Sequence, residues 1–174
     1  MNIGIFYGST GGNTENVARL IRRQLGGKEI TLINVASLQD AQSMQDYDLL
    51  VWGCPTYGDG ELQDDWDLLE PRLDDVDLRG KLVAIFGLGD QEGYAHKFVD
   101  AIGILHERAL DCGADTIGHW SDEGYDYEAS RALIAESLLC GLAIDEDNQS
   151  ELTEERVSRW CAQVLEETRV MLGP

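Results

Sequence analysis

A run rich in glycine and hydroxyl side chains, GSTGGNTE at residues 8–15, lies between an apolar segment and a helical pattern. Its polar side chains are Ser9, Thr10, Asn13 and Thr14, and its glycines let backbone N–H groups approach an anion closely. The run has no Lys or Arg and neither GxxxxGK[ST] nor GxGxxG spacing, so it favours a phosphate monoester over a nucleoside triphosphate or a dinucleotide. The alternative is a glycine turn in which Thr14 or Asn13 caps the helix.

Two further loops each carry an aromatic residue. CPTYGDGELQDDW at 54–66 has Tyr57 beside Gly58, and GLGDQEGY at 87–94 ends in Tyr94. An aromatic face can stack on a flat ligand, and glycine lets a peptide reverse its direction. Taken singly, each loop is also typical of an ordinary surface turn. Together, the three loops offer what a planar ring on a phosphate-bearing tail requires.

The loops follow apolar segments that alternate with helical patterns. The segments 3–7, 30–35, 49–53 and 82–87 are rich in Ile, Val and Leu, as are strands buried on both faces. Apolar residues at helical spacing lie between and after them: Val17, Leu20, Ile21 and Leu25; Phe98, Ala101, Ile102 and Leu105; Val157, Trp160, Cys161, Val164 and Leu165. This order predicts a doubly wound α/β fold whose ligands bind beyond the carboxyl ends of parallel strands.

The region after the fourth strand departs from the pattern. Residues 115–120 look like a strand, 121–141 show no clear periodicity, and 142–144 form a second apolar piece before the acidic run 145–147. We expect a five-stranded parallel sheet whose fifth strand is interrupted by an insertion. No repeat or linker marks a second unit, so residues 1–174 are predicted to form a single domain. The last helix is expected to open at Thr153.

The charge balance is strongly acidic, with 33 acidic and 13 basic residues and a net charge of −20. Such a chain repels nucleic acid and anionic lipid. No apolar run approaches the length of a membrane span, so we expect a cytoplasmic protein. The four cysteines lie far apart, which predicts core thiols and no metal site.

The acidic residues are unevenly placed along the chain. Residues 29–71 hold ten acidic residues and no Lys or Arg, and residues 109–155 hold thirteen against Arg131 alone. Basic residues gather on the first helix, where Arg19, Arg22 and Arg23 lie. This placement predicts that basic partners are steered to the acidic side, and the alternative is a charge surplus that only maintains solubility.

The motifs together resemble the flavodoxin family, in particular its long-chain subgroup, over nearly the whole chain. They are FYGSTGGNTE at 6–15, GCPTYGDGELQDDW at 53–66, GLGDQEGYAHKF at 87–98, GHWSDEGYDYE at 118–128 and GLAIDEDNQSELTEERVSRW at 141–160. The resemblance implies a monomeric, low-potential one-electron carrier with non-covalently bound FMN, which shuttles electrons between a basic reductase and acceptor enzymes without turning over a substrate. Two alternatives are an FMN-dependent quinone or NAD(P)H oxidoreductase on the same fold and a phospho-receiver module, whose acidic pocket and phosphorylatable Asp the loops lack.

The resemblance also implies roles for individual residues. Residues 9–14 would hold the FMN phosphate, Thr56 would lie near the ribityl chain, and Asp90 would bond the pyrimidine edge. Tyr94 would stack on the outer face of the flavin and Tyr57 on the inner face. The full set of implied cofactor-binding residues is Ser9, Thr10, Gly11, Gly12, Asn13, Thr14, Pro55, Thr56, Tyr57, Gly58, Asp59, Gly60, Gly87, Leu88, Gly89, Asp90 and Tyr94.

Two residues depart from the family pattern. Gly11 stands where Thr or Ser is usual, which removes one hydroxyl from the phosphate loop, and Tyr57 stands where long-chain members usually carry Trp. The resemblance places the Gly58–Asp59 peptide at flavin N5, where a flip would accept a hydrogen bond from the half-reduced flavin. Carboxylates of the second loop would each oppose the next electron by roughly 0.7 kcal/mol at about 12 Å, or about 30 mV.

Overall fold

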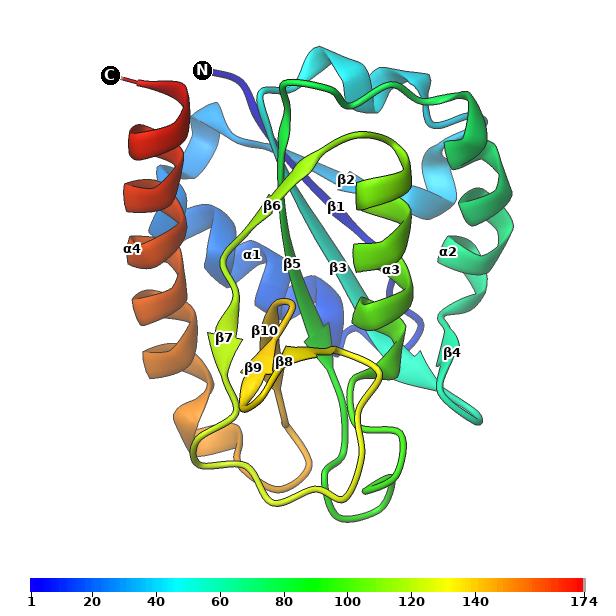
Figure 1. Cartoon of the computed structure of the whole chain (residues 1–174), viewed down its shortest axis with the longest axis vertical. Helices are drawn as coiled ribbons and strands as arrows, with labels where there is room; N and C mark the ends of the chain where they lie inside the picture. Colours follow the sequence, from blue (N-terminus) through cyan, green and yellow to red (C-terminus); the bar gives the residue numbers. More distant parts are fainter. Residues whose placement is uncertain (174) are drawn as a thin grey trace.

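A parallel sheet runs through the centre of the molecule. The computed structural model describes residues 1–173 (Figure 1). The sheet follows the order β2 (Thr31–Asn34), β1 (Ile3–Tyr7), β3 (Leu49–Tyr57) and β5 (Leu82–Leu88), with β6 (Asp115–Ile117) and β10 (Leu142–Ile144) both paired to β5. A short strand, β4 (Glu61–Leu62), pairs antiparallel with the end of β3. This topology confirms the predicted doubly wound α/β fold.

Helices cover both faces of the sheet. Helices α1 (Asn13–Leu25) and α4 (Thr153–Leu172) lie on one face, and α2 (Asp64–Leu69) and α3 (Asp100–Asp111) lie on the other (Figure 1). The central strands β1, β3 and β5 are almost wholly buried, because each face is covered by an apolar cluster. Short 3-10 helices span Gly27–Glu29, Val35–Ser37, Gln42–Asp46, Glu70–Asp75 and Ser150–Leu152.

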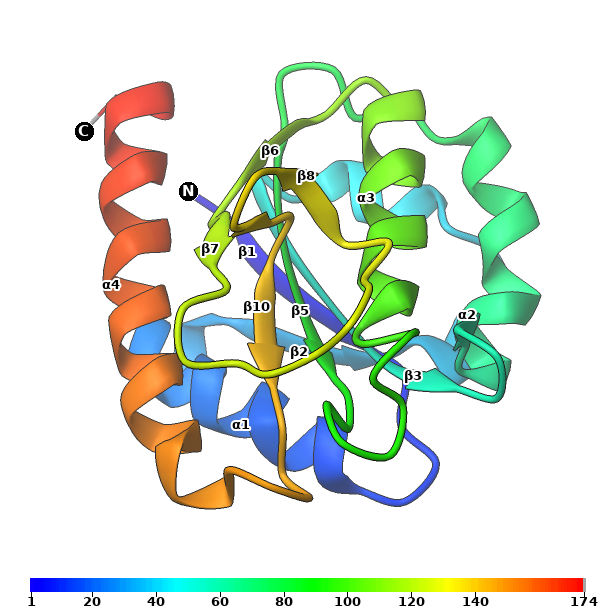
Figure 2. The same ribbon diagram turned by 60° about the horizontal axis from the view of Figure 1, so that its bottom comes forward.

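The fifth strand is split in two, as the sequence predicts. Strand β6 pairs with the first half of β5, from Leu82 opposite Asp115, and β10 pairs with its second half, from Phe86 opposite Leu142. Between them the chain leaves the sheet. It forms the small antiparallel sheet β7 (Trp120–Ser121), β9 (Leu138–Leu139) and β8 (Leu133–Ala135), which lies beside α4 (Figures 1 and 2).

Several local predictions need correction. The strand expected at 115–120 ends at Ile117, because Gly118 adopts a left-handed backbone with φ of +73° and turns the chain out of the sheet. The insertion contains strands that its sequence does not signal. Part of the second loop is the helix α2, which Gln63 caps by accepting bonds from the N–H groups of Asp65 and Trp66. The last helix, α4, does open at Thr153 as expected, and the Thr153 hydroxyl donates to Glu146.

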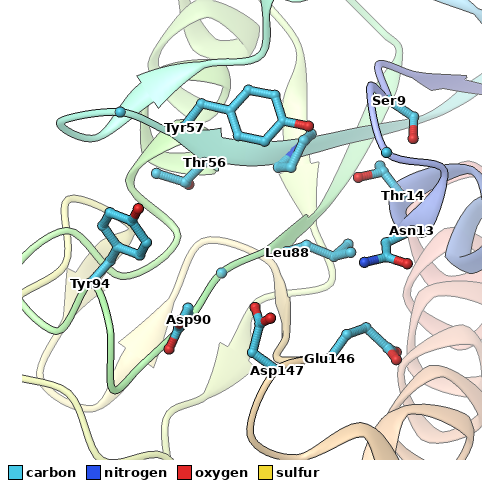
Figure 3. A pocket seen from close by; sticks show the side chains of 14 residues that line it. Ser9, Asn13, Thr14, Thr56, Tyr57, Leu88, Asp90, Tyr94, Glu146 and Asp147 are labelled. Carbon is cyan, nitrogen blue, oxygen red and sulfur yellow. The ribbon is translucent and has the colours of Figure 1, made fainter.

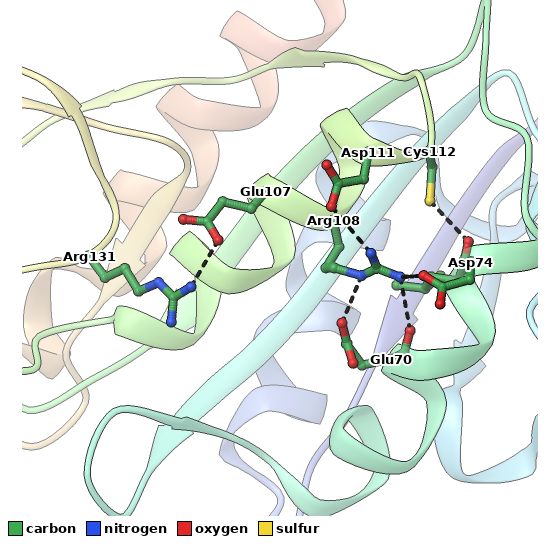
Figure 4. Close-up of polar contacts among 8 residues, drawn as sticks. Glu70, Asp74, Glu107, Arg108, Asp111, Cys112 and Arg131 are labelled. Atoms are coloured by element: carbon green, nitrogen blue, oxygen red, sulfur yellow. Dashed lines mark hydrogen bonds and ion pairs between the residues drawn. The ribbon is translucent and has the colours of Figure 1, made fainter.

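An ion-pair cluster fastens α3 to the 3-10 helix at 70–75. The Arg108 guanidinium lies 2.7 Å from a carboxylate oxygen of Glu70 and 2.5 Å from one of Asp74, and it also reaches Asp111 (Figure 4).

The four cysteines are buried and free, which confirms them as core thiols. Among residues 1–173, none of the helices has the length and apolar composition that a bilayer crossing requires.

Candidate functional site

A cavity of about 340 Å³ lies where four parallel strands end (Figure 3). Loops after β1, β3, β5 and β10 form its walls, because the carboxyl ends of parallel strands meet at one edge of the sheet. The lining residues are Ser9, Gly11, Asn13, Thr14, Pro55, Thr56, Tyr57, Gly58, Leu88, Gly89, Asp90, Tyr94, Glu146 and Asp147. Twelve of these fourteen are among the seventeen residues that the sequence predicts for cofactor binding.

One end of the cavity is polar and lies at the start of α1. Gly12, with φ of +92°, precedes the helix, and neither Asn13 nor Thr14 caps it. The capping alternative for these two residues is therefore wrong, and both side chains line the cavity instead (Figure 3). The Ser9 hydroxyl oxygen accepts bonds from the N–H groups of Gly12 and Glu15, which leaves its own proton free to donate.

The other end of the cavity is aromatic. Tyr57 ends β3 and is 36% exposed, and Tyr94 closes the loop after β5 and is 57% exposed. Tyr94 lies across the cavity from Ser9 and Asn13, and the Tyr57 ring lies between them, with its hydroxyl directed toward Thr14 (Figure 3). The turn after Tyr57 uses glycines with positive φ, +51° at Gly58 and +81° at Gly60.

A buried carboxylate ties two of the loops together. Asp145 is fully buried and accepts hydrogen bonds from the backbone and side-chain N–H groups of Gln91 and Asn148. The Asn148 amide also donates to Asp90, 2.8 Å away. A bond from the Gly93 N–H, followed by the one from Asn148, lowers the pKa of Asp90. The Asp90 carboxylate therefore stabilises its own loop and joins that loop to Asn148.

Sequence reasoning missed two acidic residues of the cavity, Glu146 and Asp147. The signal was available, because β10 is a parallel strand of the same sheet and the loop after Ile144 must therefore reach the same edge. Burial, followed by the charge of the neighbouring Asp90, raises the pKa of Asp147.

Five predicted residues do not line the cavity: Thr10, Gly12, Asp59, Gly60 and Gly87. The Thr10 hydroxyl accepts a bond from the Gln63 amide, 3.3 Å away. Gly87 lies in β5, where its backbone approaches α3. A carboxylate oxygen of Asp59 lies 3.8 Å from the ammonium nitrogen of Lys97. The sequence does not indicate a cation beside this loop.

The charged side chains that line the cavity are all acidic, which is unusual for a site that would bind an anion. No Lys or Arg lines it, and three carboxylates do: Asp90, Glu146 and Asp147. An anionic group at the polar end must therefore rest on backbone N–H groups, on hydroxyls and on the positive end of the α1 dipole. An added Cβ at Gly11 would meet nothing within 4 Å, so the backbone there is open to a ligand.

The arrangement suits an elongated molecule with an anionic tail and a flat ring. The hydroxyls, the amide and the helix start suit the tail, and the two tyrosines suit the ring. Among the described residues, no group of three or more His, Cys, Asp or Glu side chains is placed to hold a metal ion.

Comparison with known proteins agrees with this geometry. The flavodoxin family model matches residues 5–160. A flavodoxin of Nostoc sp. is 51% identical over 165 residues, which are 95% of this chain and 96% of the relative. Flavodoxin 1 of Escherichia coli K12 is 47% identical over 164 residues, or 94% of this chain and 93% of the relative.

A solved structure is similar over the same length. The crystal structure of Fusobacterium nucleatum flavodoxin bound to flavin mononucleotide superposes with a TM-score of 0.88 at 29% identity, and covers 95% of this chain and 98% of that one. The family match, the relatives and the fold lead to one conclusion, that the chain belongs to the flavodoxin family.

Proposed function

We propose that this chain binds FMN without a covalent bond in the cavity of about 340 Å³ and carries single electrons between two partner proteins. One observation carries the proposal. The start of α1, with the side chains of Ser9, Asn13 and Thr14, and two tyrosines line one cavity, as a phosphate tail and a flat ring require. The FMN-bound Fusobacterium nucleatum relative supports the choice of cofactor.

The chain's own groups would hold the tail in a largely uncharged cradle. The Ser9 hydroxyl has a free proton to donate, and Asn13 and Thr14 line the cavity beside it. Backbone N–H groups at a helix start favour an anion without a counter-charge. Gly11 contributes no hydroxyl, and its open surroundings let the backbone approach the anion directly.

At the aromatic end, Tyr57 and Tyr94 would cover the ring and limit its contact with water. FMN supplies one-electron oxidation and reduction when it is bound. Gly58 already has a left-handed backbone, so the peptide that follows it can change orientation at low cost. The Thr56 hydroxyl accepts a bond from the N–H of Ala101, 3.1 Å away, which holds this wall against the start of α3.

Acidic side chains around the cavity would make the carrier strongly reducing. Glu146 and Asp147 line it, and carboxylates there oppose the arrival of negative charge. At an effective dielectric constant of about 40 and about 12 Å, each costs roughly 0.7 kcal/mol, or about 30 mV. The double variant Glu146→Gln, Asp147→Asn should therefore raise the second one-electron potential by about 60 mV at low salt. Asp115→Asn removes a charge from the far edge of the sheet and should leave the potential unchanged.

The same charges would select the partners. Exposed Asp59, Glu61 and Glu92 lie in the segments that carry Tyr57 and Tyr94, and basic residues gather on α1. A basic reductase and acceptor enzymes with basic docking surfaces therefore fit best. Rates of electron transfer to such partners should fall steeply as salt rises. We further propose that residues 1–174 form a single domain, that the protein is a monomer and that it works in the cytoplasm.

Titration of the apoprotein with FMN, followed by stepwise reduction, tests the proposal. We expect tight stoichiometric binding and two separate one-electron steps in the visible spectrum. Ser9→Ala and Thr14→Val should weaken FMN binding more than riboflavin binding, because only FMN carries the phosphate. A protein that takes up no FMN would refute the proposal. Steady oxidation of NADPH or NADH by the FMN-loaded protein alone would favour the quinone or NAD(P)H oxidoreductase instead.

A further inference from the structure

A second cavity, of about 570 Å³, lies between the insertion and the first turns of α4. Its walls include Trp120 of β7, Leu152, and the arginines Arg156 and Arg159 of α4. The insertion and the start of this helix lie side by side in both ribbon views (Figures 1 and 2). None of its lining residues lines the flavin cavity.

Arg156 is the unusual feature of this cavity. The residue is 93% buried, since only 7% of its surface is exposed. Its guanidinium carbon lies 4.1 Å from the ring centre of Tyr125, so the cation stacks on an aromatic face. No ion pair or hydrogen bond joins it to another side chain or carbonyl in the part of the chain that the structure describes. A stacked guanidinium keeps its N–H donors at its edges, and here these donors lack a protein acceptor.

Three other arginines of the protein provide the contrast. Arg108 meets three carboxylates, and Arg131 and Arg169 each meet one within 2.8 Å. In a chain of net charge −20, a buried arginine without a carboxylate partner is therefore not a consequence of scarce acids. A guanidinium whose N–H groups lack a protein acceptor needs water or an anion there. Its nitrogens are not among the fully enclosed unpaired polar atoms, so they remain reachable through the cavity.

A second arginine strengthens the site. Arg159 lies one turn further along α4, with its guanidinium 5.5 Å from the ring centre of Trp120 and only a long contact of 3.9 Å to Glu155. Two guanidinium groups at i and i+3 share one helix face and can present their forks to the same oxyanion. The indole N–H of Trp120 is already bonded to the Tyr125 hydroxyl, which fixes the aromatic wall.

The rest of the lining limits the charge and shape of the ligand. Glu123 and Glu155 also line the cavity, and they disfavour a multiply charged anion. Trp120 and Leu152 offer apolar surface to a flat body. We propose that this cavity binds a small monocarboxylate with a flat, apolar body, with its carboxylate on Arg156 and Arg159.

Nuclear magnetic resonance of the FMN-loaded, ¹⁵N-labelled protein tests the proposal with benzoate as the probe. The bound cofactor keeps benzoate out of the flavin cavity. We expect saturable shifts of the Trp120 indole N–H and the Arg156 side-chain N–H signals. Benzyl alcohol, which has the same ring but no charge, should bind at least tenfold more weakly, and inorganic phosphate should bind more weakly than benzoate.

Variants separate the arginines from general charge effects. Arg156→Met keeps the stem over Tyr125 and should weaken benzoate binding about tenfold or more. Arg159→Gln should weaken benzoate binding less than Arg156→Met does, and Arg156→Lys should retain part of the affinity for benzoate. If Arg156→Met does not fold, these two variants are compared with the wild type instead. Arg169→Gln is the matched control, because Arg169 and Arg159 share one helix and the same 67% side-chain exposure.

Three results would overturn the proposal. The first is the absence of saturable shifts over the whole solubility range of benzoate. The second is equal binding of benzoate by wild type and Arg156→Met, or equal binding of benzyl alcohol and benzoate, because either removes the role of the guanidinium. The third is tighter binding of phosphate than of benzoate, which would assign the cavity to a multiply charged anion.

Discussion

Replacing the buried carboxylate of Asp145 by an amide tests how the loops of the flavin cavity are held. Asp145 is fully buried at the end of β10, and its two oxygens accept bonds from Gln91, Asp147 and Asn148. Asp145→Asn keeps the shape of the side chain. It turns one acceptor into a donor, so at least two N–H groups, such as the backbone and side-chain N–H of Gln91, would face another N–H.

The expected cost follows from these contacts. A hydrogen bond to a charged group contributes about 1.5–3 kcal/mol, and a buried donor left unsatisfied costs about 1–3 kcal/mol. With at least two donors affected, each at about 1.5 kcal/mol, Asp145→Asn should lower the free energy of unfolding by about 3 kcal/mol. For a domain of this size, that corresponds to a fall in Tm of roughly 6–12 °C. FMN affinity should fall as well, because the loops that carry Asp90 and Asp147 lose their common anchor.

Urea denaturation of the apoprotein and FMN titration measure the two effects separately. Asp115→Asn is the matched control, because it also replaces one Asp by Asn at an end of the split fifth strand, but at an exposed position on the far edge. The control should change stability by less than about 0.5 kcal/mol. Equal stability of Asp145→Asn and the control would refute the reasoning, since it would show that these hydrogen bonds do not hold the loops.

Three further predictions concern a tight contact, a turn and a pH dependence. Gly87→Ala would place a Cβ 2.3 Å from the Cγ2 methyl of Ile102, so it should destabilise the fold by about 1–3 kcal/mol in urea denaturation, and Ile102→Ala, which removes that methyl, should cost less in the Gly87→Ala background than in the wild type. Gly58→Val forces a β-branched residue into φ of +51°, so it should cost about 1–2 kcal/mol and narrow the gap between the two one-electron potentials of the FMN-loaded protein; an unchanged gap would contradict a role for this peptide. Burial lowers the pKa of both His106 and His119, so the unfolded chain takes up protons first and stability should be lost as pH falls below about 6.5. The loss between pH 7.5 and 5.5 should be smaller in the variant with both histidines changed to Gln, and an equal loss in both proteins would contradict it.

The sequence predicts much of the fold because its signals are local. Strands β1 and β10 match the predicted segments 3–7 and 142–144, because buried strands need uninterrupted apolar residues. Three loops of the cavity could be found for the same reason, since each directly follows such a segment. Helix α2 was missed because it is six residues long and lies in a segment rich in Gly and Asp, which reads as a turn.

The sequence by itself determined the fold class, the interruption of the fifth strand and most of the cofactor cradle, because residue type and spacing along the chain carry that information. Only the tertiary structure placed Lys97 beside Asp59 and Arg156 on Tyr125. Each of these pairings joins residues from different elements. Their distance depends on strand register and on the path of the insertion, which the packing of the whole molecule decides.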